Sequence, residues 1–324
     1  KGYYFFFQKH LFYALASFFL MIFISMINTE LINKSLIPIF LFFLLLLILV
    51  PFFGVEVKGA KRWLSIYIFR FQPIEFVKPF FILVVAQIIS STKIKSLNLS
   101  HVISFLFLSI IALLLLIQPD VGQTILLAAS WSSLIFISGF NIIFLILIFS
   151  FLIALFFLLL YLAPDRFDYI ISRITSFMDP EKSGWSQSQK AIEAIQQGGL
   201  KGRGMGEGIL KENVPEAHTD YIIAVVSEEF GSAVSVLIII IFLFIAFRII
   251  KKVISFSNNY YKLALCGLIS LIIFQTFIHI GVNANLLPTT GMTLPFLSYG
   301  GSSLLSTGIV AGIILNFTSL NEKN

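Results

Sequence analysis

Long apolar runs fill most of the chain, and short polar segments separate them. A run of about 20 mostly apolar residues is long enough to cross a bilayer as a helix. Backbone polar groups cannot stay unpaired in hydrocarbon, so we expect helices rather than open strands. Runs such as Phe40–Leu49 lack the alternation of a transmembrane β-barrel. The pattern therefore predicts nine spanning helices, at residues 9–28, 36–53, 75–91, 101–118, 121–139, 141–163, 221–247, 260–282 and 300–316.

Three segments interrupt this pattern. Residues 54–74 are polar and rich in lysine and arginine, and residues 164–220 form the one long loop. Residues 283–300 are mildly apolar but contain prolines and glycines, so we expect a re-entrant or interfacial segment rather than a span. The chain is expected to form a single transmembrane domain over residues 1–324, with the large loop inside it.

The composition narrows the class of protein. Hydrophobic residues make up 58% of the 324 positions and charged residues 12%. Soluble domains contain about 45–50% apolar and about 25% charged residues, and could not bury so much apolar side chain. The composition therefore excludes a soluble enzyme and a disordered chain, and favours an all-α, polytopic membrane protein.

The charge indicates the kind of partner, and the cysteine count excludes two kinds of site. The net charge of +6 suggests anionic lipid head groups or an anionic lipid-linked substrate at least as readily as nucleic acid. The one cysteine, Cys266, can form neither an intrachain disulfide nor a cysteine-based zinc site.

Two polar motifs lie at expected helix starts. Glu75 and Lys78 are three residues apart, hence on one helix face. They form either an internal ion pair or, through Lys78, a contact for a lipid-linked anion. Asp120 follows Pro119 between two apolar runs. It is either an ordinary turn residue or a functional acid, because an acid so close to hydrocarbon is costly.

The long loop carries a glycine cluster at residues 198–208, together with Lys201 and Arg203. Glycine lets backbone N–H groups approach an anion closely, and the two cations add charge. The cluster is therefore either an anion cradle or a flexible loop.

The same loop ends at Asp220, which leads straight into an apolar helix. Asp220 is either an N-cap or a reactive acid. His218 is as suited to an orienting hydrogen bond as to catalysis. Glu228 and Glu229 lie about two turns further along, and we expect them to hold other helices or to bind cations.

Six motifs follow one another in a fixed order: Gly59–Trp63, Gln72–Lys78, Gln118–Gly122, Pro215–Tyr221, Ser227–Gly231 and Leu297–Ser303. Together they resemble the SEDS proteins (shape, elongation, division, sporulation). The resemblance covers nearly the whole chain, from about residue 5 to about residue 316. Residues 215–220 and 285–303 are more similar to the cell-division branch of the family than to its elongation branch.

This resemblance implies a bundle of ten helices with both termini in the cytoplasm. The present chain would begin just before the family's second helix, which would explain nine spans and place the 164–220 loop outside the cytoplasm. A count of basic residues alone favours the opposite orientation. We expect the family's orientation, because the loop's cations would then have an anionic substrate to meet.

SEDS proteins are peptidoglycan glycosyltransferases that polymerise lipid II, a disaccharide-pentapeptide on undecaprenyl pyrophosphate. The family's essential acid maps onto Asp220, which we expect to act as general base on the acceptor 4-hydroxyl. The leaving pyrophosphate needs positive charge, for which Lys61, Arg62, Lys78 and Arg203 are the candidates. A divalent cation, Mg²⁺ or Mn²⁺, is a further candidate.

The resemblance also implies supporting roles and partners. Glu75 and Asp120 are expected to organise the cavity, and His218 to orient the loop. A class B penicillin-binding protein with transpeptidase activity and other division proteins are the expected partners, at the septum of the bacterial cytoplasmic membrane. No nucleic acid is expected.

Two other functions fit the same helices. The chain could flip lipid II across the bilayer, or it could recruit division proteins without any chemistry. A flippase needs no base, so the variant Asp220→Asn separates it from a glycosyltransferase.

Overall fold

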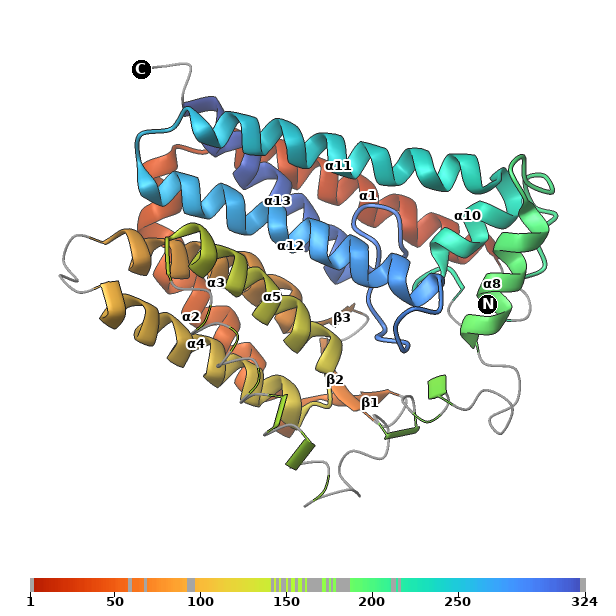
Figure 1. The fold of residues 1–324 in the computed structure, drawn as a ribbon, viewed down its shortest axis with the longest axis horizontal. Coiled ribbons are helices and arrows are strands. Elements are labelled where there is room, and N and C mark those ends of the chain that lie inside the picture. The colour runs from red at the N-terminus through yellow and green to blue at the C-terminus, as the bar shows by residue number, and fades with distance from the viewer. Residues whose placement is uncertain are drawn as a thin grey trace.

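The structure, a computed structural model, describes residues 3–57, 60–66, 69–91, 97–140, 187–210, 214 and 217–320, with single residues between 143 and 178. Within these residues, seven helices are long and apolar enough to cross a membrane. Figure 1 shows them packed side by side along a common direction. They are α1 (Tyr3–Met26), α2 (Thr29–Phe53), α3 (Pro73–Ser90), α4 (Leu97–Ile117), α11 (Ser232–Ile254), α12 (Asn259–Asn283) and α13 (Gly301–Ser319).

Most of the predicted spans are confirmed. The helices α1, α2, α3, α4, α12 and α13 overlap six of them. The predicted span 121–139 corresponds to α5 (Val121–Ile137), which is apolar but shorter than the others. The predicted span 141–163 lies largely outside the described residues, and those described within it, such as Ile143 and Ile153, are helical.

The predicted span 221–247 is confirmed as a spanning helix, α11, but its predicted start is wrong, because the chain breaks at Gly231. The short helix α10 (Ile222–Phe230) ends there and α11 begins at the next residue. Gly231 has a φ of 92°, a left-handed conformation that glycine adopts most readily. A Cβ atom at this position would lie 2.1 Å from the carbonyl oxygen of Leu200. The break is therefore set by a close backbone contact, which an apolar run does not reveal.

Helix α3 lies at the centre of the bundle. It contacts α2, α4, α5, α12 and α13, and its residues from Pro73 to Ala86 are all buried. A helix that is apolar on all sides is typical of such a position. As a consequence, the few polar side chains at the start of α3 are enclosed by other helices.

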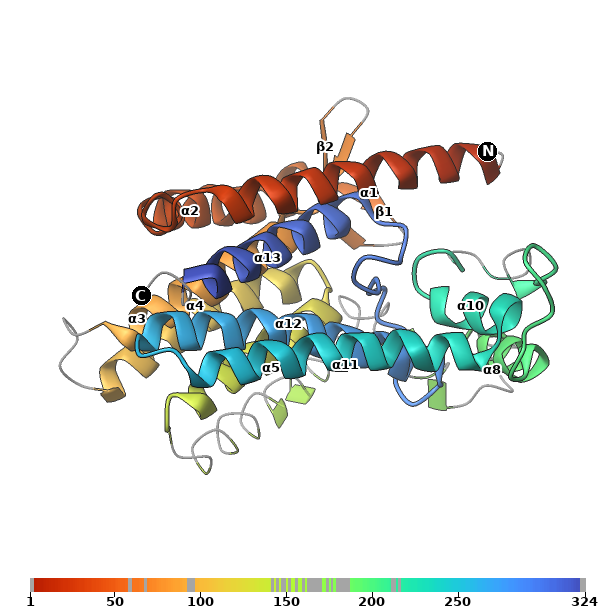
Figure 2. The same ribbon diagram turned by 90° about the horizontal axis from the view of Figure 1, so that it is seen from above.

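Helix α1 packs mainly against α13, on the outer side of the bundle (Figure 2). A Cβ atom on Gly308 would lie 2.6 Å from the carbonyl oxygen of Ser17, so the two backbones meet closely. The Ser17 hydroxyl donates to the carbonyl oxygen of Leu304 at 2.6 Å. Small residues and interhelical hydrogen bonds are the usual means of packing helices within a membrane.

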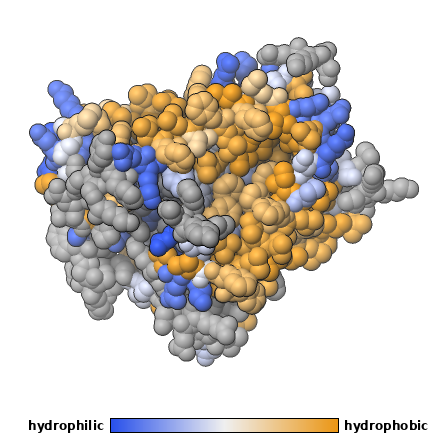
Figure 3. Space-filling model, turned by 180° about the vertical axis from the view of Figure 1, so that it is seen from behind, coloured by the Kyte–Doolittle hydropathy of each residue, from blue (hydrophilic) through white to orange (hydrophobic). Residues whose placement is uncertain are grey.

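The outer surface has the character of a membrane protein. Figure 3 shows a broad apolar surface on one face, with hydrophilic side chains gathered at its margins. The exposed side chains of α1, α2 and α11 are mostly large and apolar. Together with the seven helices, this surface makes the chain an integral, multi-pass membrane protein.

A small antiparallel sheet joins α2 to α3 and was not predicted from the sequence. It consists of β1 (Val55–Val57), β2 (Ala60–Ile66) and β3 (Phe69–Phe71), in the order β1-β2-β3. Glu56 pairs with Lys61, and Leu64 pairs with Phe71. The pairing register passes from Lys61 to Trp63, so Arg62 is the extra residue of a bulge in β2, and the regular alternation of side chains is interrupted there.

Two further segments complete the site region. Helix α8 (Gln187–Gly198) packs on α10, and a second small core forms around Ala194, Leu210 and Tyr221. Residues 284–300 contain turns and irregular backbone without a helix, as expected for a segment that does not span.

Candidate active site

A polar cavity of about 160 Å³ lies where six segments of the chain meet. Its walls come from the β1–β2 sheet, the starts of α3 and α13, the turn before α5, the turn before α10 and the 284–300 segment. Four of the eight predicted site residues line it. The titratable and amide side chains at its wall are Arg62, Gln72, Glu75, Asp120, Asp220 and Tyr299.

Arg62 fastens one wall of this cavity. Its Nε donates to the carbonyl oxygen of Gln118 at 3.3 Å, and its Nη2 donates to that of Pro119. The same Nε lies 3.7 Å from Oδ2 of Asp120. The planar guanidinium therefore holds both the backbone and the carboxylate of the turn between α4 and α5.

Asp120 is a buried acid at the N-cap position of α5. Its side chain makes no capping hydrogen bond. Its Oδ2 instead accepts from Nε2 of Gln72 at 3.3 Å. Burial raises the pKa of the Asp120 carboxyl, and the nearby positive charge of Arg62 opposes that rise.

Glu75 and Lys78 form the internal ion pair that was one of the two alternatives. Lys78 Nζ lies 2.9 Å from Oε2 of Glu75 and donates to Oε1 of Gln123 at 2.9 Å. Gln123 Nε2 donates to the other Glu75 oxygen at 2.8 Å. Lys78 is only 1% exposed and is not among the cavity-lining residues, so a contact between Lys78 and substrate stays a prediction.

Asp220 lines the cavity from the turn that leads into α10. The N-cap of α10 is Tyr221, so the alternative that Asp220 caps this helix is wrong. Asn283 fixes the backbone of this turn, because its Nδ2 donates to the Asp220 carbonyl oxygen at 3.0 Å. The carboxyl group of Asp220 is half-buried, so it combines a fixed backbone with access to the cavity.

His218 is exposed and lies beside the cavity rather than in its wall. Its ring packs against Tyr299 at 5.4 Å and against Phe6 at 5.0 Å. The backbone N–H of Tyr299 donates to the His218 carbonyl oxygen at 3.0 Å, and Ser298 Oγ donates to the carbonyl oxygen of Thr219 at 2.7 Å. Residues 218–219 are therefore fastened to the 284–300 segment.

Tyr299 is a site residue that was not predicted. It lies in the cavity wall, and burial raises the pKa of its phenol, which keeps the hydroxyl protonated at neutral pH.

The other two predicted cations lie away from the cavity wall. Lys61 is exposed on β2, one residue before Arg62. Arg203 Nη1 lies 3.5 Å from Oε1 of Glu228, and its backbone N–H donates to the Glu228 carbonyl oxygen at 2.9 Å. Neither cation belongs to the lining of the Asp220 cavity.

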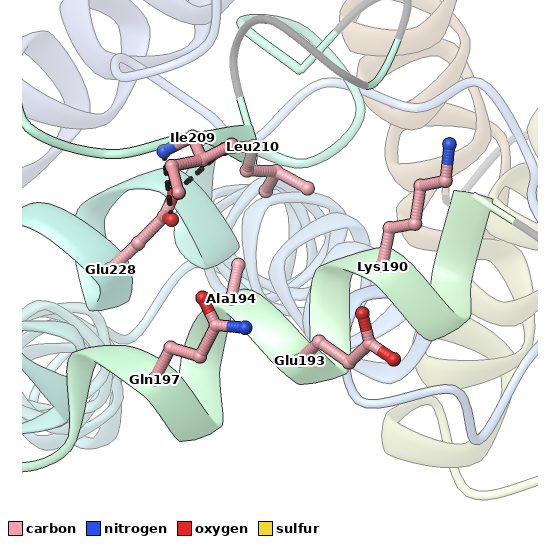
Figure 4. A pocket seen from close by; sticks show the side chains of 7 residues that line it. All are labelled: Lys190, Glu193, Ala194, Gln197, Ile209, Leu210 and Glu228. Atoms are coloured by element: carbon pink, nitrogen blue, oxygen red, sulfur yellow. Dashed lines mark hydrogen bonds between the residues drawn. The ribbon is translucent and has the colours of Figure 1, made fainter.

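The carboxylate of Glu228 binds the backbone at the end of the glycine loop (Figure 4). Its two carboxylate oxygens accept from the backbone N–H groups of Ile209 at 2.8 Å and Leu210 at 3.0 Å. A Cβ atom on Gly208 would lie 2.9 Å from Oε2 of Glu228. Glu228 was expected to hold other helices or to bind cations; its carboxylate instead binds backbone N–H groups at the end of the loop and lies beside Arg203.

The loop glycines also allow close packing of backbone on backbone. A Cβ atom on Gly198 would lie 2.0 Å from the Ser227 carbonyl oxygen, and one on Gly202 would lie 2.3 Å from the Glu229 carbonyl oxygen. A second cavity of about 260 Å³ remains between α8 and this loop, with Lys190, Glu193 and Gln197 pointing into it (Figure 4).

A metal site is not preformed in the described part of the chain. No three His, Cys, Asp or Glu side chains there are placed so that they could hold a metal ion. Glu75 and Asp120 are instead occupied by Lys78 and Arg62. A divalent cation, Mg²⁺ or Mn²⁺, at the substrate pyrophosphate stays a prediction.

Gln123 and Asn283 carry much of this geometry and were not predicted. Gln123 lies in the first turn of α5 and Asn283 is the last residue of α12, and both side chains are buried. An amide side chain at the end of an apolar run was the available signal, since a buried polar group needs a partner.

The chain is similar in sequence to known proteins. A Caulobacter vibrioides protein named probable peptidoglycan glycosyltransferase FtsW is 38% identical over 309 residues, which are 94% of this chain and 77% of the relative. Stage V sporulation protein E of Bacillus subtilis is 34% identical over 286 residues, which are 87% of this chain and 78% of that protein.

Solved structures share the fold. A chain from a structure of a peptidoglycan synthase complex that coordinates polymerisation and crosslinking superposes with a TM-score of 0.76 at 22% identity, covering 98% of this chain and 90% of that one. The rod shape determining protein RodA of Thermus thermophilus superposes with a TM-score of 0.68 at 23% identity, covering 98% and 88%.

A sequence profile built on FtsW, RodA and SpoVE, described as a cell cycle protein family, matches residues 1–323. The match confirms the resemblance seen in the six motifs, and the chain belongs to the FtsW/RodA/SpoVE family.

Proposed function

We propose that this chain is a peptidoglycan glycosyltransferase, which polymerises lipid II into glycan strands during septal wall synthesis. Relatives that cover most of the chain bear the name peptidoglycan glycosyltransferase. The observation that carries the proposal for this chain is the half-buried Asp220 carboxyl, which shares one cavity with the Arg62 guanidinium.

The reaction joins the 4-hydroxyl of one lipid-linked GlcNAc to C1 of a lipid-linked MurNAc. The new bond is O4–C1, the broken bond is C1–O to the pyrophosphate, and configuration at C1 inverts. Asp220 takes the hydroxyl proton as O4 attacks, because an alcohol is a poor nucleophile without a base. The lipid pyrophosphate departs with the electron pair and needs positive charge rather than a proton.

Arg62 supplies that charge at the cavity wall. It is the cation among the lining residues of this cavity, and its side chain is fixed by two backbone carbonyl groups. A fixed cation stabilises developing charge without reorganising during the reaction. Lys61, the exposed residue before Arg62 on the same strand, meets the anionic head group as it approaches.

The remaining predicted residues act through others. Asp120 and Glu75 hold Arg62 and Lys78, and thereby set the shape of the cavity. Lys78 supports the cavity through its buried ion pair with Glu75. Arg203 supports the neighbouring loop through its ion pair with Glu228. His218 keeps the Asp220 turn against Tyr299.

We further propose an orientation and a partner. The 164–220 loop lies on the outer side of the cytoplasmic membrane, where lipid II is consumed at the septum. A class B penicillin-binding protein with transpeptidase activity binds the chain, since a chain of the same fold occurs in a peptidoglycan synthase complex. Co-purification of the two proteins from membranes tests the partnership.

One experiment separates the glycosyltransferase from the flippase and the scaffold. Proteoliposomes with the chain and its transpeptidase partner receive fluorescent lipid II, and both polymer and transbilayer movement are recorded. We expect polymer from the native chain and none from Asp220→Asn. Flipping without polymer in both proteins would favour the flippase. Neither activity, with normal recruitment of division proteins, would favour the scaffold.

A further inference from the structure

Three buried polar side chains form a row along one face of α12. Gln275, His279 and Asn283 are spaced by four residues, which places them one above another on a helix. They are 5%, 1% and 1% exposed. Polar groups buried to this degree in an apolar helix must be satisfied by other parts of the chain.

Asn283 joins the end of α12 to the start of α10. Its Nδ2 donates to the carbonyl oxygens of Asp220 at 3.0 Å and of His279 at 2.8 Å. Its Oδ1 accepts from the backbone N–H of Ala224 at 3.1 Å. One side chain thus fixes the residue before α10 and the first turn of α10 itself.

The other two members hold another part of the cavity wall, in the 284–300 segment. His279 Nδ1 lies 2.8 Å from the carbonyl oxygen of Met292, and because a carbonyl only accepts, this nitrogen donates. Gln275 Nε2 donates to the carbonyl oxygen of Thr293 at 2.8 Å. Thr293 lines the cavity and shares a 2.6 Å hydrogen bond with Ser303, which lines it too.

We infer that this row on α12 sets the distance between the two walls of the cavity, and that Asn283 is the positioning residue for Asp220. The inference rests on the proposed function, since it concerns the placement of the base. Without Asn283, the Asp220 carbonyl and the Ala224 N–H both lose a partner, so the turn shifts to find new ones. A displacement of about 1 Å in a catalytic group can lower a rate about 100-fold.

A merely structural asparagine is available as a matched control. Asn316 on α13 is also buried, at 4% exposure, and its Nδ2 donates to the carbonyl oxygens of Ile24, Ser25 and Ile27. These contacts lie between α13 and the end of α1, and none of them involves a residue that lines the Asp220 cavity. Asn316→Ala therefore removes comparable hydrogen bonds without touching the site.

The test compares Asn283→Ala, the near-isosteric Asn283→Asp and Asn316→Ala in the purified full chain with its partner. We expect both Asn283 variants to lower kcat for lipid II polymerisation by about 10-fold to 100-fold, with KM changed by less than about twofold. Hydrogen exchange of the amides at 221–226 should become faster in both. Asn316→Ala should retain the native kcat and the native exchange at 221–226, whatever its thermal stability.

Failure of this inference can be distinguished from failure of the proposed function. If the native chain makes no polymer, the glycosyltransferase proposal fails, and exchange at 221–226 alone decides whether Asn283 holds the turn. If the Asn283 variants and Asn316→Ala show the same kcat and the same exchange, Asn283 is an ordinary structural residue and the inference is overturned.

Discussion

The Nε of Arg62 lies 3.7 Å from Oδ2 of Asp120, in the wall of the cavity that Asp220 also lines. The pair links the sheet after α2 to the turn before α5. In the proposed function Arg62 has two roles: it holds the turn before α5, and its fixed positive charge stabilises the leaving pyrophosphate.

We expect Arg62→Ala to lower polymerisation about 100-fold or more, because it removes the charge and frees the α4–α5 turn. Arg62→Lys should also lose most activity, since one ammonium cannot replace the guanidinium fork that reaches two carbonyls and a carboxylate. Polymerisation rates of purified protein check this. Arg70→Ala, which removes an exposed cation from β3 of the same sheet, is the control and should keep native activity. Equal losses in Arg62→Ala and Arg70→Ala would argue against a specific role.

The raised pKa of Asp120 has a consequence for stability. An acid whose pKa is higher in the folded than in the unfolded chain stabilises the fold below its unfolded pKa, and this contribution is lost as pH rises through the folded pKa. Asp120→Asn should therefore gain thermal stability relative to the native chain as pH rises from about 4 to about 8. Thermal unfolding in detergent measures the difference. A difference that is constant over this range would contradict the assignment.

The buried pair of Glu75 and Lys78 should behave as a unit. Lys78→Met leaves the Glu75 carboxylate buried without its cation, which we expect to destabilise the chain by about 3–5 kcal/mol. The double variant Glu75→Gln with Lys78→Met removes both charges and should recover most of that loss. Thermal unfolding of the two single variants and the double variant gives the coupling. Additive effects would show that the two charges do not interact.

Two glycines of the loop have similar φ angles but different surroundings, so substitutions at them form a matched pair. Gly202 and Gly206 have φ values of 80° and 86°. A Cβ atom at Gly202 would lie 2.3 Å from the Glu229 carbonyl oxygen, whereas nothing lies within 4 Å of one at Gly206. Both alanine variants carry the strain of a left-handed residue, about 1 kcal/mol. Gly202→Ala alone should also push α10 away, and so should unfold at a clearly lower temperature. Equal unfolding temperatures would show that the close contact is unimportant.

Much of the helical architecture could be predicted from the sequence, because hydropathy and the need for internal backbone hydrogen bonds leave few options in a membrane. The end of α10 at Phe230 could not be predicted in this way. Residues on both sides of Gly231 are apolar or small, and the break depends on the carbonyl oxygen of Leu200, about 30 positions earlier in the chain. A contact between distant segments leaves no trace in the local pattern.

The candidate site was predictable in its chemistry but not in its geometry. Residue types and motifs pointed to Asp220, Arg62, Glu75 and Asp120, which line one cavity. They also pointed to Lys78 and Arg203, whose charges are paired with Glu75 and Glu228. Which acid lies beside which cation depends on tertiary packing, because four candidate cations and three candidate acids allow many pairings.

The central claim is that the Asp220 carboxylate is the general base for glycan polymerisation. The most direct measurement is the initial rate of polymer formation from labelled lipid II by purified chain with its transpeptidase partner, at matched amounts of folded protein. Three proteins are compared: the native chain, Asp220→Asn, and Glu207→Gln, which neutralises an exposed acid of the same loop.

We expect Asp220→Asn to lower the rate at least about 100-fold, because the amide has the shape of the acid but cannot take a proton at neutral pH. Glu207→Gln should polymerise at the native rate. Polymer formation by Asp220→Asn at the rate of the native chain would contradict the account.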